Sequence, residues 1–344
     1  MDTITLQNPL DMHVHFRESE MLKVVAPLTA EHFSGALVMP NTQRIINSFE
    51  RVGQYRTDIA IAVQPHEFTP YMTLYFSTDY DYKSLQEIKP HILAIKFYSQ
   101  GMTTNSEHGT DPDDISVLSV LGHMEELDIP LCVHAEAHGY WLDREQNFYV
   151  YLTSWTRRYP RLKIIIEHIT DAMTLRMIQD FPNLYGTVTP HHLLLTTDDV
   201  IGDTLRPHLF CKPLMKRPSD RRALCDTVFS GPERIQRKLM LGTDSAPHDE
   251  SNKLKDCGCA GIFTAPIALQ LLAEDFHRYS YQEKFQDFVS GNAQRIYGIE
   301  PIHKKTVTLV RKPFIIPARY GKVVPMWAGQ KIQWSIDDGS GNRQ

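Results

Sequence analysis

Two histidines separated by a single residue, His13 and His15, lie near the start of the chain. They follow an apolar run that is typical of a β-strand, and side chains two residues apart on a strand point to the same face. Both imidazoles could therefore bind one metal ion without any bend in the backbone. A role as hydrogen-bonded core residues is the alternative interpretation of the pair.

Other side chains that can bind a metal end later apolar runs. His134, His168 and Asp244 each come at or just after the end of such a run. Imidazole nitrogens and carboxylate oxygens are ligands that suit Zn²⁺. Any one of these histidines alone is more simply explained as a core residue, but their recurrence at strand ends favours a shared metal site.

Lys96 lies inside the apolar run Ala94–Tyr98, where burial disfavours an ammonium group without a partner. In one interpretation the aliphatic stem packs inside while the amine reaches solvent. In the other, the neutral amine has reacted with CO₂ to form a carbamate, whose oxygens can bridge two cations. Together with the histidines and Asp244, Lys96 favours a metal-dependent hydrolase.

The elements that must position these side chains are short apolar runs separated by amphipathic segments. The runs span residues 10–16, 36–39, 72–76, 92–97, 130–134, 162–168, 185–189 and 238–243. Short apolar strands fit a parallel sheet buried on both faces. Eight strand–crossover units predict an α/β fold of the (β/α)₈ TIM-barrel type, in which the carboxyl ends of all strands open at one mouth. The six polar groups are predicted to meet there.

The rest of the pattern predicts a single domain over residues 1–344. After the eighth run, residues 265–274 and 281–288 have helical patterns, and 306–310 and 331–336 have strand patterns. We expect roughly 300–344 to be a small C-terminal appendage packed on the barrel.

Composition excludes several classes of partner. The 344 residues carry a net charge of −5, which gives no reason to expect binding to nucleic acid or to an anionic membrane. No apolar run approaches the length of a membrane span. No cationic side chain precedes Arg17, so a charged signal-peptide start is absent. We expect a cytoplasmic protein whose five cysteines are reduced thiols.

Several different short motifs are distributed along nearly the whole chain. The most specific are Gly242-Thr243-Asp244-Ser245-Ala246-Pro247-His248 and Cys257-Gly258-Cys259-Ala260-Gly261. The others are His13-Val14-His15-Phe16-Arg17, Met39-Pro40-Asn41, Lys96-Phe97-Tyr98, Thr103-Thr104-Asn105-Ser106, Val133-His134-Ala135-Glu136, Glu167-His168 and Arg206-Pro207-His208-Leu209. The chain thereby resembles the short, single-domain (class II) dihydroorotases of the amidohydrolase superfamily. The resemblance implies reversible hydrolysis of (S)-dihydroorotate to N-carbamoyl-L-aspartate, a step in the synthesis of pyrimidines (UMP).

The resemblance also implies two Zn²⁺ ions per subunit. The ligands it implies are His13, His15, Lys96, His134, His168 and Asp244. The histidine pair and Asp244 would hold the more buried ion, and the two later histidines the more exposed one. Lys96, carbamylated by CO₂ or bicarbonate, would bridge both ions together with a nucleophilic hydroxide. Asp244 would serve as general base and acid.

A further set of residues is implied to contact the substrate. They are His15, Arg17, Asn41, Thr103, Thr104, Lys212, His248 and Ala260. Arg17 suits a bidentate grip on the substrate carboxylate. Lys212 departs from the apolar residue expected at its position, but a contact through the backbone tolerates the change. The polar segment 99–106 is expected to be a lid, with an ordinary surface loop as its alternative, while Asn41 could instead cap a turn and His248 lie at the surface.

Two other functions compete with this interpretation. Another cyclic amidase, such as a dihydropyrimidinase or allantoinase, would share the metal ligands, but it would lack the motif around Asp244. A non-catalytic barrel scaffold would have lost ligands, whereas all six are present. The pairs His191-His192 and Cys257/Cys259 are interpreted as structural. The expected partners are a small-molecule substrate and a second copy of the chain in a homodimer.

Overall fold

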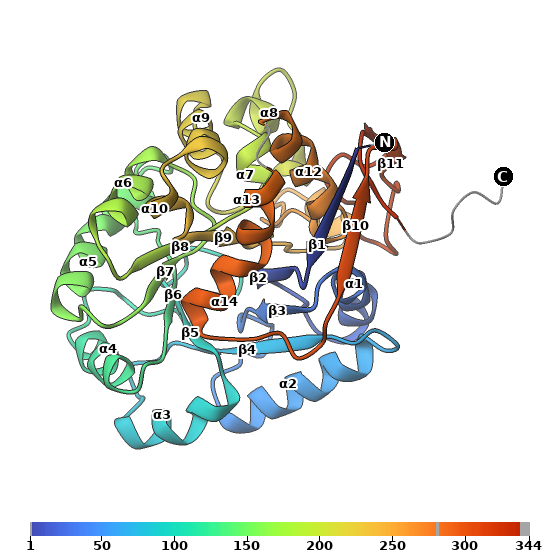
Figure 1. Cartoon of the computed structure of the whole chain (residues 1–344). Coiled ribbons are helices and arrows are strands. Elements are labelled where there is room, and N and C mark those ends of the chain that lie inside the picture. The colour runs from blue at the N-terminus through green and yellow to red at the C-terminus, as the bar shows by residue number, and fades with distance from the viewer. Residues whose placement is uncertain (1, 280–281, 338–344) are drawn as a thin grey trace.

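The computed structural model describes residues 2–279 and 282–337. In that part of the chain, eight parallel strands form a barrel in chain order, with helices around it (Figure 1). The strands are β2 (Leu10–Val14), β3 (Gly35–Val38), β4 (Thr69–Tyr75), β5 (Ala94–Tyr98), β6 (Leu131–His134), β7 (Ile164–Ile166), β8 (Leu184–Val188) and β9 (Leu239–Leu241). Each overlaps one of the predicted apolar runs, so the (β/α)₈ TIM barrel is confirmed.

The barrel closes between its first strand and the segment that follows its last. The backbone N–H of Asp244 donates to the His13 carbonyl at 2.8 Å, and that of His15 donates to the Ser245 carbonyl at 3.1 Å. These two bonds continue the sheet from β9 back to β2. Closure itself therefore places Asp244 beside the histidine pair, although the residues are far apart in sequence.

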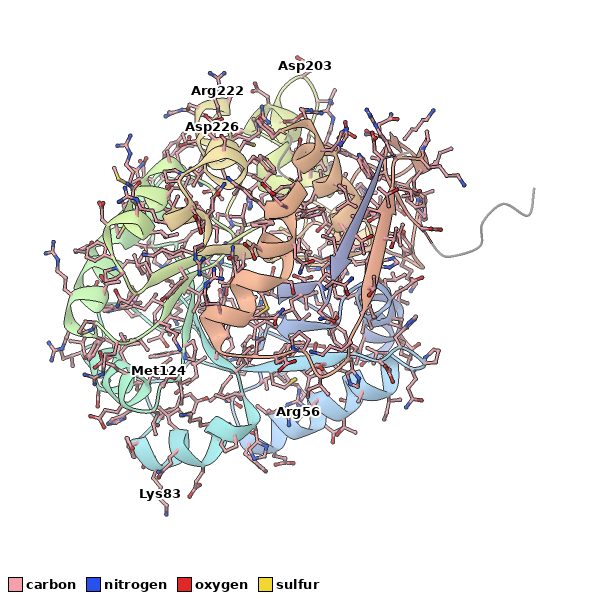
Figure 2. The ribbon with its side chains drawn as sticks, viewed as in Figure 1. Arg56, Lys83, Met124, Asp203, Arg222 and Asp226 are labelled. Carbon is pink, nitrogen blue, oxygen red and sulfur yellow. The ribbon has the colours of Figure 1, made fainter. Side chains whose placement is uncertain are left out.

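Helices lie between successive strands and after the last one, and most of them cover the outside of the barrel. They are α1 (Ser19–His32), α2 (Phe49–Ala62), α3 (Tyr82–Ile88), α4 (Ser116–Glu126), α5 (Arg144–Arg158), α6 (Ala172–Asp180), α7 (Pro190–Leu194), α8 (Thr197–Ile201), α9 (Pro218–Cys225), α10 (Glu233–Gln236), α11 (Glu250–Lys253), α12 (Ala268–Arg278), α13 (Gln282–Gln286) and α14 (Asn292–Tyr297). Local chemistry starts several of them: the Asp171 side chain, for example, accepts the Thr174 N–H at 2.7 Å and caps α6. Figure 2 shows Lys83 of α3 and Arg222 of α9 reaching outward from this layer.

Two apolar layers hold the barrel and its helices together. The larger lies between strands and helices, and it receives alternate side chains of most strands. The smaller fills the barrel interior and is closed by α14; its members include Leu10, Met12, Leu37, Met39, Ala94, Cys132, Ile165, Met240, Ala293, Ile296 and Tyr297. Because this plug occupies the amino ends of the strands, polar groups are left to the opposite, carboxyl end.

A small antiparallel sheet lies beside the barrel and joins the two ends of the described chain. It consists of β1 (Thr3–Gln7), β10 (Thr306–Val310) and β13 (Ser335–Ile336), and a separate pair is formed by β11 (Phe314–Ile315) and β12 (Lys331–Ile332). The strand predicted at 306–310 is confirmed, the one predicted at 331–336 is divided into β12 and β13, which belong to different sheets, and β1 had not been predicted. Residue 281 of the predicted helix 281–288 and residues 338–344 of the expected appendage lie outside the described residues.

Two expectations from composition can be compared with the described residues. Within ranges 2–279 and 282–337, no helix combines the length and apolarity needed to cross a bilayer. All five cysteines are free thiols, as expected: Cys132, Cys211 and Cys225 are buried, and Cys257 and Cys259 reach the surface at least in part.

Candidate metal centre and active site

A register shift inside β2 turns the predicted histidine pair toward the mouth of the barrel. Leu10 and Met12 pack in the barrel interior, whereas Val14 packs outward under the helices. His13 and His15 flank Val14 and therefore point inward, with their Nε2 atoms 3.3 Å apart. The two histidines share a face, as strand alternation predicted. The register shift explains why this inward face carries Leu10 and Met12 before the shift and the two histidines after it.

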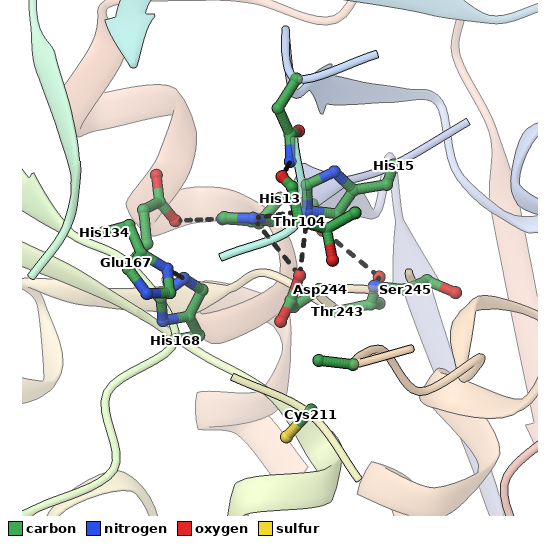
Figure 3. A network of polar contacts seen from close by, with 12 residues as sticks. His13, His15, Thr104, His134, Glu167, His168, Cys211, Thr243, Asp244 and Ser245 are labelled. Carbon is green, nitrogen blue, oxygen red and sulfur yellow. Dashed lines mark hydrogen bonds and ion pairs between the residues drawn. The ribbon is translucent and has the colours of Figure 1, made fainter. Parts of the chain in front are cut away.

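Asp244 completes the first half of the site. Its Oδ1 lies 3.1 Å from His15 Nε2 and 3.4 Å from His13 Nε2. The three side chains offer ligand atoms within 4.8 Å of one another, and all three are buried. Figure 3 shows the carboxylate below the two imidazoles. Two nitrogens and one oxygen in this arrangement can hold a zinc ion.

The second half of the site is formed by His134 and His168. His134 Nδ1 lies 3.1 Å from His168 Nε2, and the rings are 4.7 Å apart between centroids. The His168 ring is also 5.1 Å from that of His13, which joins the two halves (Figure 3). The predicted ligands thus converge at one place. They come from β2, from the ends of β6 and β7, and from the segment after β9.

Two carboxylates orient the histidines from behind. Glu167 Oε2 lies 2.7 Å from His13 Nδ1, and Glu136 Oε2 lies 2.6 Å from His134 Nε2. Each contact engages the ring nitrogen that faces away from the site, and so leaves the other nitrogen free for a metal. The sequence analysis gave neither glutamate a role. The only signal for Glu136 in the sequence is its position two residues after His134, where the backbone turns.

The surroundings of Glu167 and Asp244 shift the pKa values of these two carboxyl groups in opposite directions. Burial alone would raise the pKa of Glu167, but His13 and Lys96 lower it to about 2. Burial raises the pKa of Asp244, against the opposing effect of His13. Glu167 is therefore set as a fixed negative charge, while Asp244 is closer to accepting a proton.

Lys96 lies at 0% exposure among these groups, and its Nζ has no hydrogen-bond partner among the described residues. The amine does not reach solvent, so the alternative in which only its stem is buried is wrong. Burial lowers the pKa of Lys96, with partial compensation by Glu167. A buried amine without a partner is costly, and carbamylation with metal binding would remove that cost. We call Lys96 and the five metal-competent residues above the six-residue cage.

Strained backbone holds two members of the cage. His168 and Asp244 have φ angles of 41° and 43°, in the left-handed region that residues other than glycine rarely adopt. Thr187 stabilises this conformation at His168, because its hydroxyl accepts the His168 N–H at 2.7 Å and donates to Glu167 at 2.6 Å. Strain of this kind concentrates at functional sites.

The predicted substrate contacts gather beside the cage. One small cavity is lined by His15, Arg17, Asn41, Thr103, Thr104, Lys212, Asp244, Ala246, Ala260 and Gly261. His248 does not line it, but His248 Nε2 lies 3.1 Å from Arg17 Nη2 and 3.0 Å from the Ala260 carbonyl oxygen. The eight residues named from the resemblance are thus brought together.

Segment 99–106, the lid segment, is held over the mouth by a pair of amide contacts. The Asn41 side chain donates to the Thr104 carbonyl at 2.9 Å, and the Asn105 side chain donates to the Asn41 carbonyl at 2.9 Å. Within the segment, Ser106 Oγ accepts the Thr103 N–H at 2.9 Å. Asn41 therefore joins β3 to the lid segment, a role different from that of a turn cap.

Lys253 organises the far wall of the cavity and was missed by the sequence analysis. Its Nζ donates to the carbonyls of Phe210, Cys259 and Gly261 at 2.9, 2.8 and 2.7 Å. One ammonium group thereby ties together the two backbone segments that carry Lys212 and Ala260. No local pattern marked this lysine, because its partner Phe210 is 43 residues away in the sequence and comes beside Cys259 and Gly261 only in the folded chain.

Comparison with known proteins assigns this site to a family. No protein-family model matches the chain. A dihydroorotase from Halorhodospira halophila is 40% identical over 98% of this chain and 99% of its own. A crystal structure of dihydroorotase from Campylobacter jejuni has a TM-score of 0.91 at 41% identity and covers 98% of each chain. An L-hydantoinase from Arthrobacter aurescens shares only the fold, with a TM-score of 0.79 at 12% identity. The chain therefore belongs to the dihydroorotase family, hydrolases that open the cyclic amide of dihydroorotate in pyrimidine synthesis.

Proposed function

We propose that the six-residue cage holds two Zn²⁺ ions, bridged by a carbamate on Lys96, and that the cavity beside it binds dihydroorotate. The observation that carries the proposal is the buried Lys96 amine, without a partner, between the two histidine groups. The donor set of imidazole nitrogens and carboxylate oxygens fits zinc. When bound, two zinc ions would polarise the scissile carbonyl and lower the pKa of the attacking water.

Asp244 is proposed to move the proton. Its Oδ1 lies beside His13 and His15, and Asp244 also lines the substrate cavity. In hydrolysis it would accept the proton of the attacking water and deliver it to the leaving amide nitrogen. In ring closure it would take the proton from that nitrogen. The raised pKa of the buried carboxyl favours this exchange.

Arg17 is proposed to anchor the substrate carboxylate. Its Nε donates to the Pro247 carbonyl at 3.0 Å, and Nη2 contacts His248. Both contacts fix the plane of the guanidinium, and Asn41 lines the same cavity as Arg17. A planar, oriented guanidinium matches a carboxylate through two parallel hydrogen bonds. Thr103 and Thr104 of the lid segment would contact the substrate from above and exclude water.

The competing functions are less well supported. Hydantoinases share the fold alone, while dihydroorotases match the whole chain. A scaffold without activity has no need for an intact cage with orienting carboxylates. We further propose that the protein is a cytoplasmic homodimer, in keeping with its thiol cysteines and the family expectation.

An assay in both directions tests the proposal. Metal-free protein would be reloaded with Zn²⁺ in the presence and absence of bicarbonate, and the conversion of dihydroorotate and of N-carbamoyl-L-aspartate measured together with bound metal. We expect activity in both directions only after zinc loading, with faster recovery when bicarbonate is present. Full activity of protein free of metal would contradict the proposal, and so would zinc-loaded protein that converts neither compound.

A further inference from the structure

A second cluster of metal-competent side chains lies outside the six-residue cage. His191 and His192 come from α7, and Cys211 comes from the segment before Lys212. Their ligand atoms lie within 4.8 Å of one another. The three residues have exposed fractions of 0%, 3% and 1%, so solvent water does not satisfy them. Figure 3 shows Cys211 below Asp244, on the side away from His15.

Distances within the cluster match the edges of a tetrahedral zinc site. His192 Nε2 lies 3.8 Å from Cys211 Sγ. The Pro213 carbonyl oxygen lies 3.1 Å from His192 Nε2 and 3.2 Å from Cys211 Sγ. Bonds of about 2.0 Å to nitrogen and about 2.3 Å to sulfur place two such ligands about 3.6 Å apart. His192, Cys211 and the Pro213 carbonyl could therefore surround an ion with little movement, and His191 offers a ligand atom within 4.8 Å of the other two side chains.

His191 supplies an independent observation that points to a ligand. Neither its Nδ1 nor its Nε2 has a hydrogen-bond partner among the described residues. A neutral imidazole carries one N–H and one lone pair, so both are left unsatisfied in the protein interior. His192 differs, because Thr189 Oγ1 engages its Nδ1 at 2.8 Å and leaves Nε2 for the cluster.

We propose that His191, His192 and Cys211 bind a structural Zn²⁺ ion, separate from the cage, with the Pro213 carbonyl at the fourth position. Two imidazoles and a thiolate form a mixed nitrogen and sulfur set that selects zinc over magnesium or calcium. Binding releases the Cys211 thiol proton to solvent. The ion ties α7 to the segment that contains Lys212, and so fixes the backbone on which the cavity wall depends.

Cobalt substitution distinguishes this site from the cage. Metal-free protein would be titrated with Co²⁺, and absorption and bound cobalt measured together. We expect a thiolate-to-cobalt band in the near ultraviolet, which the nitrogen and oxygen donors of the cage cannot produce. Cys211→Ser should remove the band and bind one cobalt ion fewer per chain. His191→Gln should weaken binding of that ion by about tenfold or more.

Cys225→Ser is the matched control. Cys225 is another buried thiol, whose Sγ donates to the Leu193 carbonyl at 3.3 Å, and its replacement should leave the band and the cobalt count unchanged. The proposal is overturned if the wild type lacks the band at full loading. It is equally overturned if the band persists in Cys211→Ser, since the thiolate would then belong to another cysteine. Should Cys211→Ser not fold, an unchanged cobalt affinity in His191→Gln contradicts the proposal by itself.

Discussion

At the scale of single residues, the site depends on which ring nitrogen each histidine presents. Glu167 and Glu136 engage the outward nitrogens of His13 and His134, and this fixes the tautomers and turns the remaining nitrogens inward. Lys96 differs in kind, because its amine has no hydrogen-bond partner among the described residues although the Glu167 carboxylate acts on its charge. The cage is thus built from oriented histidines around one reactive amine.

Glu167→Gln should weaken zinc binding while the fold is kept. The amide still fills the space and can accept a hydrogen bond from His13, but it removes the negative charge beside the ring, so affinity should fall by about 10- to 100-fold. Competition with a chromophoric chelator would measure this. Glu125→Gln is the control, since Glu125 pairs with exposed Arg161 away from the site. Equal zinc affinity in both variants would show that Glu167 does not orient His13 for metal binding.

Arg17→Ala should raise KM for dihydroorotate by about 10- to 100-fold, with a smaller change in kcat. The expected size follows from the loss of hydrogen bonds between charged groups at the substrate carboxylate. Steady-state kinetics in both directions check it, with Arg161→Ala as a control at an exposed arginine. An unchanged KM would show that another group holds the carboxylate.

At the scale of elements, the strands could be predicted and the contacts between distant segments could not. The eight barrel strands are continuous apolar runs, a strong local signal. The metal ligands could be inferred because they end those runs. β1 was missed although its alternate side chains are buried like those of β10, and its pairing with β10 joins opposite ends of the chain. The role of Lys253 was hidden because it joins the Phe210 carbonyl, 43 residues away, to two carbonyls in the turn that follows α11.

Asn105→Ala should loosen the lid segment. It removes the hydrogen bond to the Asn41 carbonyl, and loss of one such bond should lower kcat about 3- to 10-fold through less frequent closure. Bound zinc should be unchanged, because no ligand is touched. Gln100→Ala, at an exposed position of the same segment whose side chain contacts the Glu107 carbonyl, should be nearly neutral. If both variants behave alike, the contact between Asn105 and Asn41 is not what holds the lid.

Asp275 on α12 gives a prediction for the dependence of stability on pH. Burial raises its pKa from 3.8 to about 6, against the opposing effect of Arg278. The folded state therefore binds the proton more tightly than the unfolded state, and this contribution to stability is lost as pH rises from about 4 to about 6. Asp275→Asn should stabilise the protein above pH 6 by at most about 3 kcal/mol. Urea denaturation at pH 4 and pH 7 measures the difference, and an equal effect at both would contradict the prediction.

At the scale of the whole molecule, the apolar residues that stabilise the barrel and the polar residues of the site lie at opposite ends of the strands. The interior plug and α14 occupy the amino ends of the strands, while the cage and the substrate cavity occupy the carboxyl ends. Closure of the barrel between β2 and the segment after β9 then joins the first metal motif to the last. A match to dihydroorotases over nearly the full chain is consistent with a site assembled from segments as far apart as His13 and Asp244.

The central claim is that the cage holds two zinc ions bridged by a carbamate on Lys96. Crystals of zinc-loaded protein grown with bicarbonate would be measured on both sides of the zinc absorption edge. The account predicts two anomalous peaks in the cage, one beside His13, His15 and Asp244 and one beside His134 and His168. Continuous density should extend from Lys96 to both peaks. A single peak in the cage, or two peaks beside an unmodified Lys96, would contradict it.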